Sequence, residues 1–460
     1  MLKDVISEKK ALFASGAHTE LRLQRNRDRA VRLLAGDVVE NVRTDTAGVS
    51  ARVYRGGRCG FSSMAECSGE AAERVLQAAE KNAAFMNEHA PGGKPPLPPL
   101  GRGRITCEAI HDPAQRVYTD FARALDDYIV KHCPKLISRC INATEDSMEK
   151  LLVVSDGTDA HTVLPRSFIY VSLTAETAEG TPVELSRAFG GEGTFDLNFT
   201  DPSSLFPEIG RLYERLMQKR EGVYADAGIH TVILGGEMTG MLSHEAVGHT
   251  VEADLVLGGS VAAHCLHRQV ASELVTLSDF AHTAFGRRCP LPVFADDEGT
   301  PARDVTLIEN GILVGYMNDR ASAVRFSMEP CGNARAWLFS DEPLIRMRNT
   351  AIHPGRDKLE DMISSVDDGY YLISSPNGQA DTTGEFMFGV SMGYEIKKGK
   401  LGRALLDTTI SGVAFEMLKT VDMVSDQVEW ECAGFCGKKQ PMPVGLGGPA
   451  LRCRVMIGGR

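Results

Sequence analysis

Glycine-containing turn pairs recur between apolar runs and indicate several short strands in the second half of this chain. Asn310-Gly311, Asp368-Gly369, Asn377-Gly378 and Lys398-Gly399 are pairs that favour the tight turns of β-hairpins. Asp156-Gly157 gives the same signal between two apolar runs of the first half. Because a hairpin turn joins strands that run in opposite directions, the sequence predicts largely antiparallel sheets.

The first half of the chain mixes strand and helix signals. Glu20–Leu34 has the pattern of a strand, and Glu70–Glu88 and Ser203–Arg220 have the apolar spacing of helices. Another helix is expected to begin with Asp112 as its N-cap and to end before Pro134. Further strands are expected at Ser50–Tyr54, Gly60–Ser63 and Val232–Leu234, further helices at Met238–Glu252, Lys358–Val366 and Val413–Val421, and a stiff exposed connector at Pro91–Pro99.

These patterns predict an α+β protein with two domains, which suits a length of 460 residues. We place the boundary near Gly222–Gly228, between the helix over Ser203–Arg220 and the first strand of the second half. Residues 1–225 are then an N-terminal mixed α/β domain. Residues 226–460 form a C-terminal domain built on a largely antiparallel, twisted sheet with a distorted active-site helix.

The charge and hydropathy of the chain exclude several classes of partner. The formal net charge is 50 − 61 = −11, so we expect no binding to nucleic acid. The arginines that recur from Arg22 to Arg32 are interpreted as one solvated face of a strand. No uninterrupted apolar run reaches about 18 residues, so we expect no membrane span.

The N-terminus and the cysteines indicate a cytoplasmic protein. Met1–Gly16 carries charges where a secretory signal peptide needs an apolar stretch. The eleven cysteines are an odd number without the spacing of a small disulfide framework. Most of them are therefore expected to be buried thiols, although one could be a metal ligand or a nucleophile.

The strongest local signal for chemistry is the string His244-Glu245-Ala-Val-Gly-His249. Its two histidines are five residues apart, so on a regular helix their side chains would point about 140° apart. A π-type turn, with about 4.4 residues per turn, reduces this offset to roughly 50°. Gly248 is the expected place for such a defect because glycine tolerates unusual dihedral angles. If both histidines bind one metal, the sequence predicts a bulged or broken helix over 244–249.

Glu245 and several other residues could complete a site of this kind. Glu245 lies beside the first histidine and is the candidate general base for a water that the metal activates. Glu252 could supply a third, carboxylate ligand, with Asp254 close by. Cys432 and Cys436 are distant candidates, and Cys436 lies in a loop-like segment between glycines, where a thiolate can reach zinc. The residues alone leave these alternatives open.

A second cluster, His264-Cys265-Leu266-His267, has the composition of a metal site as well. On a helix His264 and His267 would be neighbours. The cluster lacks a paired Cys-x-x-Cys, so the histidines at 244 and 249 are the stronger candidates.

The chain resembles the TldD/PmbA family of metallopeptidases over most of its length, and most strongly from about residue 230 onward. The string His244-Glu-Ala-Val-Gly-His249-Thr-Val-Glu252-Ala-Asp254 is similar to the active-site string of that family. Other segments that resemble the family are Asp297-Glu-Gly-Thr-Pro301, Arg346-Met-Arg-Asn-Thr350, Gly384-Glu-Phe-Met-Phe-Gly389 and Phe435-Cys-Gly-Lys-Lys-Gln-Pro-Met-Pro-Val-Gly445.

The resemblance implies a metal held by His244, His249 and Cys436, with Glu245 as the catalytic glutamate. It implies zinc, with iron as the other possibility. It also implies a cytoplasmic peptidase that trims leader peptides or degrades small unfolded proteins, working as a homodimer or as a heterodimer with a PmbA-like subunit. Because this chain keeps the whole set of residues, it resembles the metal-bearing TldD-like subunit.

The function expected from the sequence is therefore hydrolysis of peptide bonds in unfolded or extended peptides. An extended peptide could add as a strand to an unpaired sheet edge, which would give main-chain recognition with little side-chain selectivity. Two alternatives stay open. The chain could be a non-catalytic peptide-binding subunit of a peptidase complex, or a metal-dependent amidohydrolase that acts on non-peptide substrates.

Overall fold

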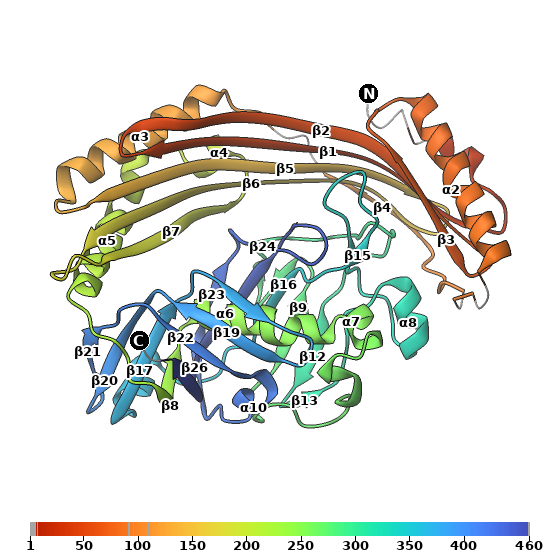
Figure 1. Cartoon of the computed structure of the whole chain (residues 1–460). Helices are drawn as coiled ribbons and strands as arrows, with labels where there is room; N and C mark the ends of the chain where they lie inside the picture. Colours follow the sequence, from red (N-terminus) through yellow and green to blue (C-terminus); the bar gives the residue numbers. More distant parts are fainter. Residues whose placement is uncertain (1–5, 7, 91–92, 95, 108–110, 459–460) are drawn as a thin grey trace.

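Two large β-sheets, one arched over the other, make up most of the molecule (Figure 1). The structure is a computed structural model that describes residue 6 and residues 8–90, 93–94, 96–107 and 111–458. The proline-rich connector and the charged N-terminal segment lie partly outside these residues. The predicted α+β class with mostly antiparallel sheets is confirmed.

The upper sheet has seven strands, and four of them are 17 to 20 residues long. Its order is β3-β2-β1-β5-β6, with β4 and β7 both paired to the far edge of β6. The pair Asp156-Gly157 lies at the turn between β5 and β6, so this predicted hairpin is confirmed. The strands are β1 (His18–Leu34), β2 (Asp37–Arg55), β3 (Arg58–Met64), β4 (Arg102–Thr106), β5 (Ser138–Val154), β6 (Gly157–Glu176) and β7 (Pro182–Glu192).

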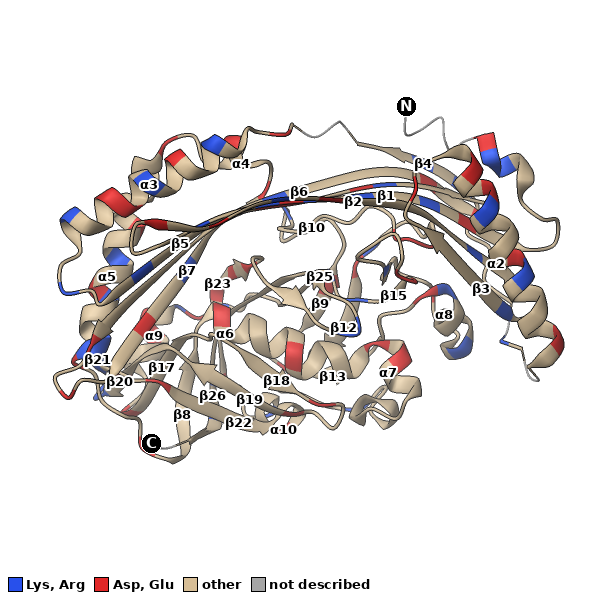
Figure 2. Ribbon diagram, turned by 45° about the horizontal axis from the view of Figure 1, so that its top comes forward, with Lys and Arg blue, Asp and Glu red and all other residues tan. Residues whose placement is uncertain are grey.

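Helices cover the two ends of this arch and give each end its own apolar core (Figure 1). α2 (Gly69–His89) packs on β2 and β3 at one end, while α3 (Gln115–His132) and α5 (Phe206–Arg220) pack on β1 and β5 to β7 at the other. Acidic and basic residues alternate along the outer sides of α2 and α3 (Figure 2). Shorter helical turns are η1 (Glu8–Leu12), α4 (Phe195–Asn198) and η2 (Pro202–Leu205).

The helix predicted to begin at Asp112 begins later. α3 starts at Gln115, after an N-cap residue, Ala114, that makes no side-chain cap hydrogen bond. The Asp112 carboxylate instead accepts a hydrogen bond from Arg43 Nη2 at 2.7 Å. The charged guanidinium of Arg43, on the neighbouring hairpin, binds the carboxylate that could otherwise cap the helix.

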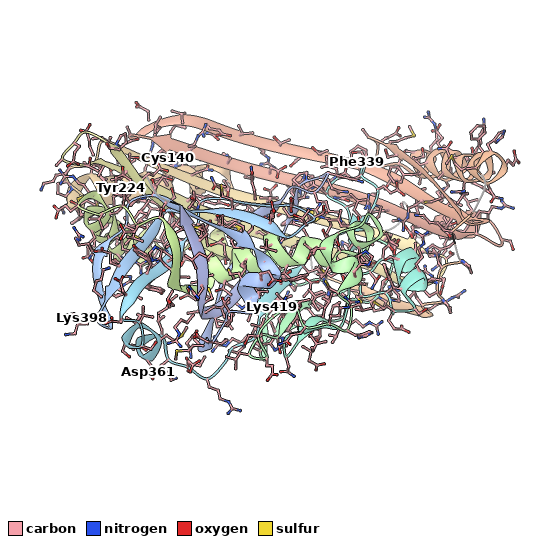
Figure 3. The ribbon with its side chains drawn as sticks, turned by 60° about the horizontal axis from the view of Figure 1, so that its bottom comes forward. Cys140, Tyr224, Phe339, Asp361, Lys398 and Lys419 are labelled. Atoms are coloured by element: carbon pink, nitrogen blue, oxygen red, sulfur yellow. The ribbon has the colours of Figure 1, made fainter. Side chains whose placement is uncertain are left out.

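The arginines of β1 were expected on a solvated face, and that interpretation is wrong for Arg22 and Arg29, which are buried. Arg22 Nη2 donates to the backbone oxygens of Leu338 and Asp341, in a loop of the second half of the chain. The middle of the arch thus presents polar groups inward, toward the lower sheet. Phe339 of the same loop is labelled in Figure 3, and its ring lies so close to Gly48 of β2 that a Cβ there would come within 2.5 Å of it.

The lower sheet has thirteen strands, and its main path is β13-β12-β9-β16-β26-β8-β17-β20-β21. β26 is central because it pairs with β16, β8, β22 and β23. The pairs β16–β26 and β8–β17 are parallel and the other pairs of this sheet's named strands are antiparallel. The strands are β8 (Gly228–Leu234), β9 (Leu277–Phe280), β12 (Val305–Glu309), β13 (Ile312–Leu313), β16 (Asn349–Ile352), β17 (Asp368–Ser374), β18 (Gly378–Ala380), β19 (Glu385–Val390), β20 (Met392–Lys397), β21 (Lys400–Ala404), β22 (Thr408–Val413), β23 (Met423–Glu431) and β26 (Gly445–Gly458).

Short ribbons and helices connect these strands. The two-stranded ribbons are β10 (Thr283–Ala284) with β11 (Arg287–Arg288), β14 (Ala334–Arg335) with β15 (Leu344–Ile345), and β24 (Phe435–Cys436) with β25 (Met442–Pro443). The helices are α6 (Gly236–Met241), η3 (Leu242–Gly248), η4 (His249–Val251), α7 (Ala253–Leu257), η5 (Val261–His264), α8 (Arg320–Phe326), α9 (Leu359–Ser364) and α10 (Ala414–Leu418). No helix of the described residues is long and apolar enough to cross a membrane.

Two of the predicted turns of this half are hairpins and two are not. Asn310-Gly311 joins β12 to β13, and Lys398-Gly399 joins β20 to β21. Asp368-Gly369 instead opens β17, which pairs in parallel with β8, and Gly378 is the first residue of β18, which pairs with β19. A turn dipeptide marks a change of direction, but the partner of the following strand is decided by contacts distant in sequence.

One buried ion pair ties the lower sheet together next to the loops that carry the candidate site. Asp279 of β9 and Arg348, which directly precedes β16, both have fully buried side chains, and Nε of the arginine is 2.8 Å from Oδ2 of the aspartate. The same carboxylate accepts hydrogen bonds from Asn333 and Thr350. Removing one charge would leave the other buried without a counter-ion.

We therefore expect Asp279→Asn to lower the free energy of unfolding by about 3–5 kcal/mol. Asp368→Asn is the control, because the Asp368–Lys397 pair is largely exposed, at 65% and 48%, and should contribute less than about 1 kcal/mol. Urea unfolding followed by circular dichroism measures both. Equal losses in the two variants would contradict the assigned role of the buried pair.

Candidate metal site

The helix that carries the two histidines is distorted as the spacing predicts. α6 continues into the π-helix η3 (Leu242–Gly248) and then into the single 3-10 turn η4. The backbone N–H of His249 donates to the carbonyl oxygen of His244, five residues earlier, which is the π-type bond. As a result, the rings of His244 and His249 lie on the same side, with centroids 5.2 Å apart.

Gly248 permits this turn for a different reason from the one expected. Its backbone is ordinary right-handed helix, with φ −53° and ψ −50°, so no unusual dihedral angle is needed. A Cβ at this position would lie 2.1 Å from the sulfur of Met347. Glycine is therefore required because the helix packs closely against the segment between β15 and β16.

The structure brings His244, His249 and Cys436 together. One potential ligand atom from each residue lies within 4.8 Å of the others, and the Cys436 Sγ is 3.4 Å from the His249 Nε2. The cysteine comes from the ribbon β24–β25, 187 residues farther along the chain than His249. His244 and Cys436 are buried, whereas 18% of the His249 side chain is exposed.

This set of side chains fits a soft divalent cation. Neither ring nitrogen of the buried His244 has a hydrogen-bond partner among the described residues. Buried polar groups are almost always paired, and a neutral imidazole has one nitrogen with a lone pair, so this unsatisfied ring beside a cysteine has a nitrogen available to bind a cation. Two imidazoles and one thiolate are a ligand set that zinc uses in catalytic sites that keep a fourth position open.

The charges of the site favour a thiolate. Burial acts to raise the pKa of the Cys436 thiol, but the neighbouring His244 and His249 imidazoles lower it to about 3. Burial acts to lower the pKa of His249, but Cys436 and Glu252 raise it to about 10. By contrast, burial raises the pKa of Cys432 to about 12. Of these two cysteines, Cys436 is therefore the one held in the ionised form that binds metals.

Glu245 lies over the open side of the site. Its carboxylate oxygens are 4.0 Å from the His244 Nε2 and 3.6 Å from the His249 Nε2. A quarter of its side chain is exposed, more than of either histidine. The carboxylate can therefore contact both the histidine pair and a molecule that enters from solvent.

Glu252 is in contact with a candidate ligand and is not itself in the cluster. Its Oε2 is 2.7 Å from the His249 Nδ1, so the imidazole N–H donates to a fully buried carboxylate. A hydrogen bond of this kind fixes the orientation of a ligating histidine. Asp254 lies farther out and forms an ion pair with Lys438 at 2.8 Å.

Buried cations hold the loop that bears Cys436. Arg346 is fully buried, and its guanidinium donates to the backbone oxygens of Cys436, Lys438 and Gln440. Arg335 donates to the carbonyl of Pro443 in the same ribbon. Sequence reasoning did not identify these arginines as loop anchors, although Arg346 lies in a segment chosen for its resemblance to the family.

The arch holds the same loop from above. Arg166 of β6 donates to the backbone oxygen of Cys432, and the Tyr170 hydroxyl donates to that of Ala433. Neither residue was singled out from the sequence. Both side chains lie on one face of β6, but that strand also carries Thr, Ser, Asp and His residues, so its pattern does not mark these two.

The other cysteine and histidine candidates lie elsewhere. Among the described residues, no second group of three potential ligands comes together. His264 and His267 do not share a helix, because η5 ends at His264 and His267 has a positive φ of 62°. Cys432 packs near Gly191 of β7, where a Cβ would lie 3.9 Å from its sulfur.

Comparisons with known proteins identify the family of the chain. The sequence model described as the PmbA/TldA metallopeptidase C-terminal domain matches residues 227–459, and the model of domain 1 matches residues 19–83. A metalloprotease TldD homolog from Buchnera aphidicola is 35% identical over 72% of this chain and 70% of its own length. The chain belongs to the PmbA/TldD metallopeptidase family.

A second relative has zinc in its name, and a solved structure has the same fold. A zinc metalloprotease TldD homolog from Saccharolobus solfataricus is 29% identical over 76% of this chain and 75% of its own length. The crystal structure of TldE from Thermococcus kodakarensis superimposes with a TM-score of 0.76 over the whole of both chains, at 18% identity. At that identity the likeness establishes the PmbA/TldD fold alone.

The close packing of Gly248 gives a direct test of the π-turn. We expect Gly248→Ala to lower the free energy of unfolding by about 1–3 kcal/mol, because its methyl group would overlap the Met347 sulfur. Gly434→Ala is the control, since a Cβ there meets no atom within 4 Å, and its effect should stay within about 0.5 kcal/mol. Urea unfolding compares the two, and a tolerated Gly248→Ala would show that the turn does not depend on this contact.

Proposed function

We propose that this protein is a metal-dependent peptidase of the PmbA/TldD family that hydrolyses peptide bonds in unfolded or extended peptides. His244, His249 and Cys436 would hold the metal, which we propose to be zinc, with iron as the alternative. The observation that carries the proposal is the meeting of these three ligand atoms within 4.8 Å, although the sulfur and the His249 ring are 187 residues apart in sequence.

The bound cation would act as a Lewis acid that polarises the scissile carbonyl and makes water easier to deprotonate. Glu245 would supply the proton transfers. Its carboxylate accepts a proton from the attacking water and delivers it to the leaving amine, as a general base and then a general acid. Its partial exposure and its position beside both histidines support this role.

The arch offers a place for an extended peptide. Among the described residues β6 is the only strand that pairs with β7, so the outer edge of β7 has no strand partner, although Lys219 Nζ donates to the backbone oxygen of Glu184. Leu185–Ala188 of this edge line a cavity of about 520 Å³ together with Tyr371 and Trp430. A peptide that adds to this edge would be recognised through main-chain hydrogen bonds, which a folded substrate cannot supply. Leader-peptide trimming and degradation of small unfolded proteins both fit such recognition.

We also propose a dimeric, cytoplasmic protein in which residues 1–225 and 226–460 are the two domains. The structural likeness to TldE supports a homodimer or a heterodimer with a PmbA-like subunit. Acidic and basic residues are mixed along the outer helices (Figure 2), and the formal net charge of −11 supports no binding to nucleic acid.

The metal site makes a prediction that does not depend on activity. Purified protein should carry about one zinc or iron ion per chain, and His244→Ala and Cys436→Ala should each weaken metal binding by more than about 100-fold. His264→Ala is the matched control and should bind as the unchanged protein does. Elemental analysis and chelator competition measure this. A chain that binds no metal at these residues would favour a non-catalytic, peptide-binding role.

The base has its own test. Glu245→Gln should retain the metal but lower kcat on an unfolded peptide by about 10²–10⁴-fold, because the amide cannot accept the proton. Glu416→Gln changes an exposed carboxylate and serves as the control. Peptide cleavage followed by mass spectrometry measures turnover. Full activity in the Glu245 variant would refute this assignment, and hydrolysis of non-peptide amides alone would redefine the substrate.

A further inference from the structure

Lys438 joins the two parts of the site that are distant in sequence. It lies two residues after Cys436, and its side chain points back to the segment that follows the histidines. Its Nζ is 3.3 Å from the Glu252 Oε2, 2.8 Å from the Asp254 carboxylate and 2.9 Å from the backbone oxygen of Ile345. The side chain is only 10% exposed, so these contacts are largely shielded from water.

Glu252 needs this cation. Its side chain is fully buried, and its Oε1 has no hydrogen-bond partner among the described residues. Lys438 is the only lysine or arginine of the described chain within ion-pair distance of it, and His249 is its other partner. A buried carboxylate that loses its cation becomes strongly unfavourable in that position, so the surrounding groups must rearrange.

The contact with Glu252 also sets how His249 faces the site. A carboxylate oxygen accepts hydrogen bonds, so the hydrogen of the ring lies on Nδ1, at 2.7 Å from Glu252. Nε2 is then the nitrogen directed toward Cys436 and Glu245, at 3.4 and 3.6 Å. The position of Glu252 therefore fixes the nitrogen that His249 can offer to a metal.

We propose that Lys438 is a positioning residue for the metal site. It keeps Glu252 in place behind His249 and at the same time ties the Cys436 loop to that carboxylate. One side chain thereby couples the orientation of one ligand to the location of another. This inference rests on the proposed function for the identity of the ligands, but the coupling itself is a property of the metal-free chain.

The chain supplies a matched control in the neighbouring lysine. Lys439 is exposed, and no ion pair links it to any described residue. Lys438→Met should weaken zinc binding by about 10–100-fold, as loss of a partner behind a ligand commonly does, and Lys439→Met should change it by less than about twofold. Competition with a chromophoric zinc chelator measures both affinities. Equal affinities in the two variants would overturn the proposal.

A purely structural role is distinguished by the melting temperature of the metal-free protein. If Lys438→Met lowers this temperature but leaves the zinc affinity of the folded protein unchanged, Lys438 is not a positioning residue. Should this variant fail to fold, Asp254→Asn replaces it, because Asp254 is 37% exposed and holds Lys438 from the solvent side. We then expect a smaller loss of zinc affinity, of about 3–10-fold, and an unchanged affinity would overturn the proposal.

A second readout separates this inference from the proposed function. Cys436 is only 2% exposed, so alkylation by iodoacetamide requires the loop to open. In metal-free protein, Lys438→Met should raise the alkylation rate of Cys436, read by peptide mass spectrometry, at least about threefold over Lys439→Met. If zinc does not bind even to the unchanged protein while this difference appears, the metal assignment fails but the coupling stands. If zinc binds and neither readout changes, the metal assignment stands and the coupling fails.

Discussion

Buried guanidinium groups hold the loop that brings Cys436 to the histidine pair. Arg346 donates to three backbone oxygens of this loop, and Arg335 donates to a fourth in the adjoining strand. These hydrogen bonds go to carbonyls, which cannot neutralise the charge. Burial, together with the charge of Arg346, accordingly lowers the pKa of Arg335 to about 9. Burial of these charges is unfavourable, but their hydrogen bonds give the short ribbon that bears the thiol a defined position.

The upper sheet also helps to position the loops around the Cys436 ribbon. Polar residues of β1, β5 and β6 contact loops of the lower sheet, while apolar residues beside them in the strands, such as Leu21 and Leu23, pack in the cores under the helices. Lys150 of β5 links both sides, since its Nζ is 2.7 Å from the Asp297 Oδ2 and 2.7 Å from the backbone oxygen of Ala336. The two sheets are thus joined by directional contacts that fix their relative position more narrowly than apolar packing would.

Features that depend on local geometry could be predicted from the sequence. The spacing of His244 and His249 required a π-turn, and the apolar repeats located α2 and α5, because both follow from the period of a helix. The resemblance to the family pointed to Cys436 before the structure placed it beside His249.

Features that depend on distant contacts could not be predicted in this way. Glycine is required at position 248 because a Cβ there would meet the sulfur of Met347, about a hundred residues later in the chain. Asp112 does not cap its helix because its carboxylate accepts a hydrogen bond from Arg43. Lys438 gave no signal at all, since a lysine beside another lysine in a glycine-rich loop has the pattern of a solvated turn. The parallel pairing of β17 with β8 was likewise not predictable, because no turn dipeptide specifies the partner of a strand.

Strands β6 and β7 connect the cavity proposed for the substrate with the loop that bears Cys436. Arg166 and Tyr170 of β6 hold the backbone just before the Cys436 ribbon, and Leu185–Ala188 of β7 beside it line the cavity of about 520 Å³. An opening of the arch wide enough for a folded substrate would break the hydrogen bonds to Cys432 and Ala433 and so release the loop that carries the thiol. An extended peptide needs no such opening. Under the proposed function, the fold would favour unfolded chains, because the position of the Cys436 loop depends on its contacts with the arch.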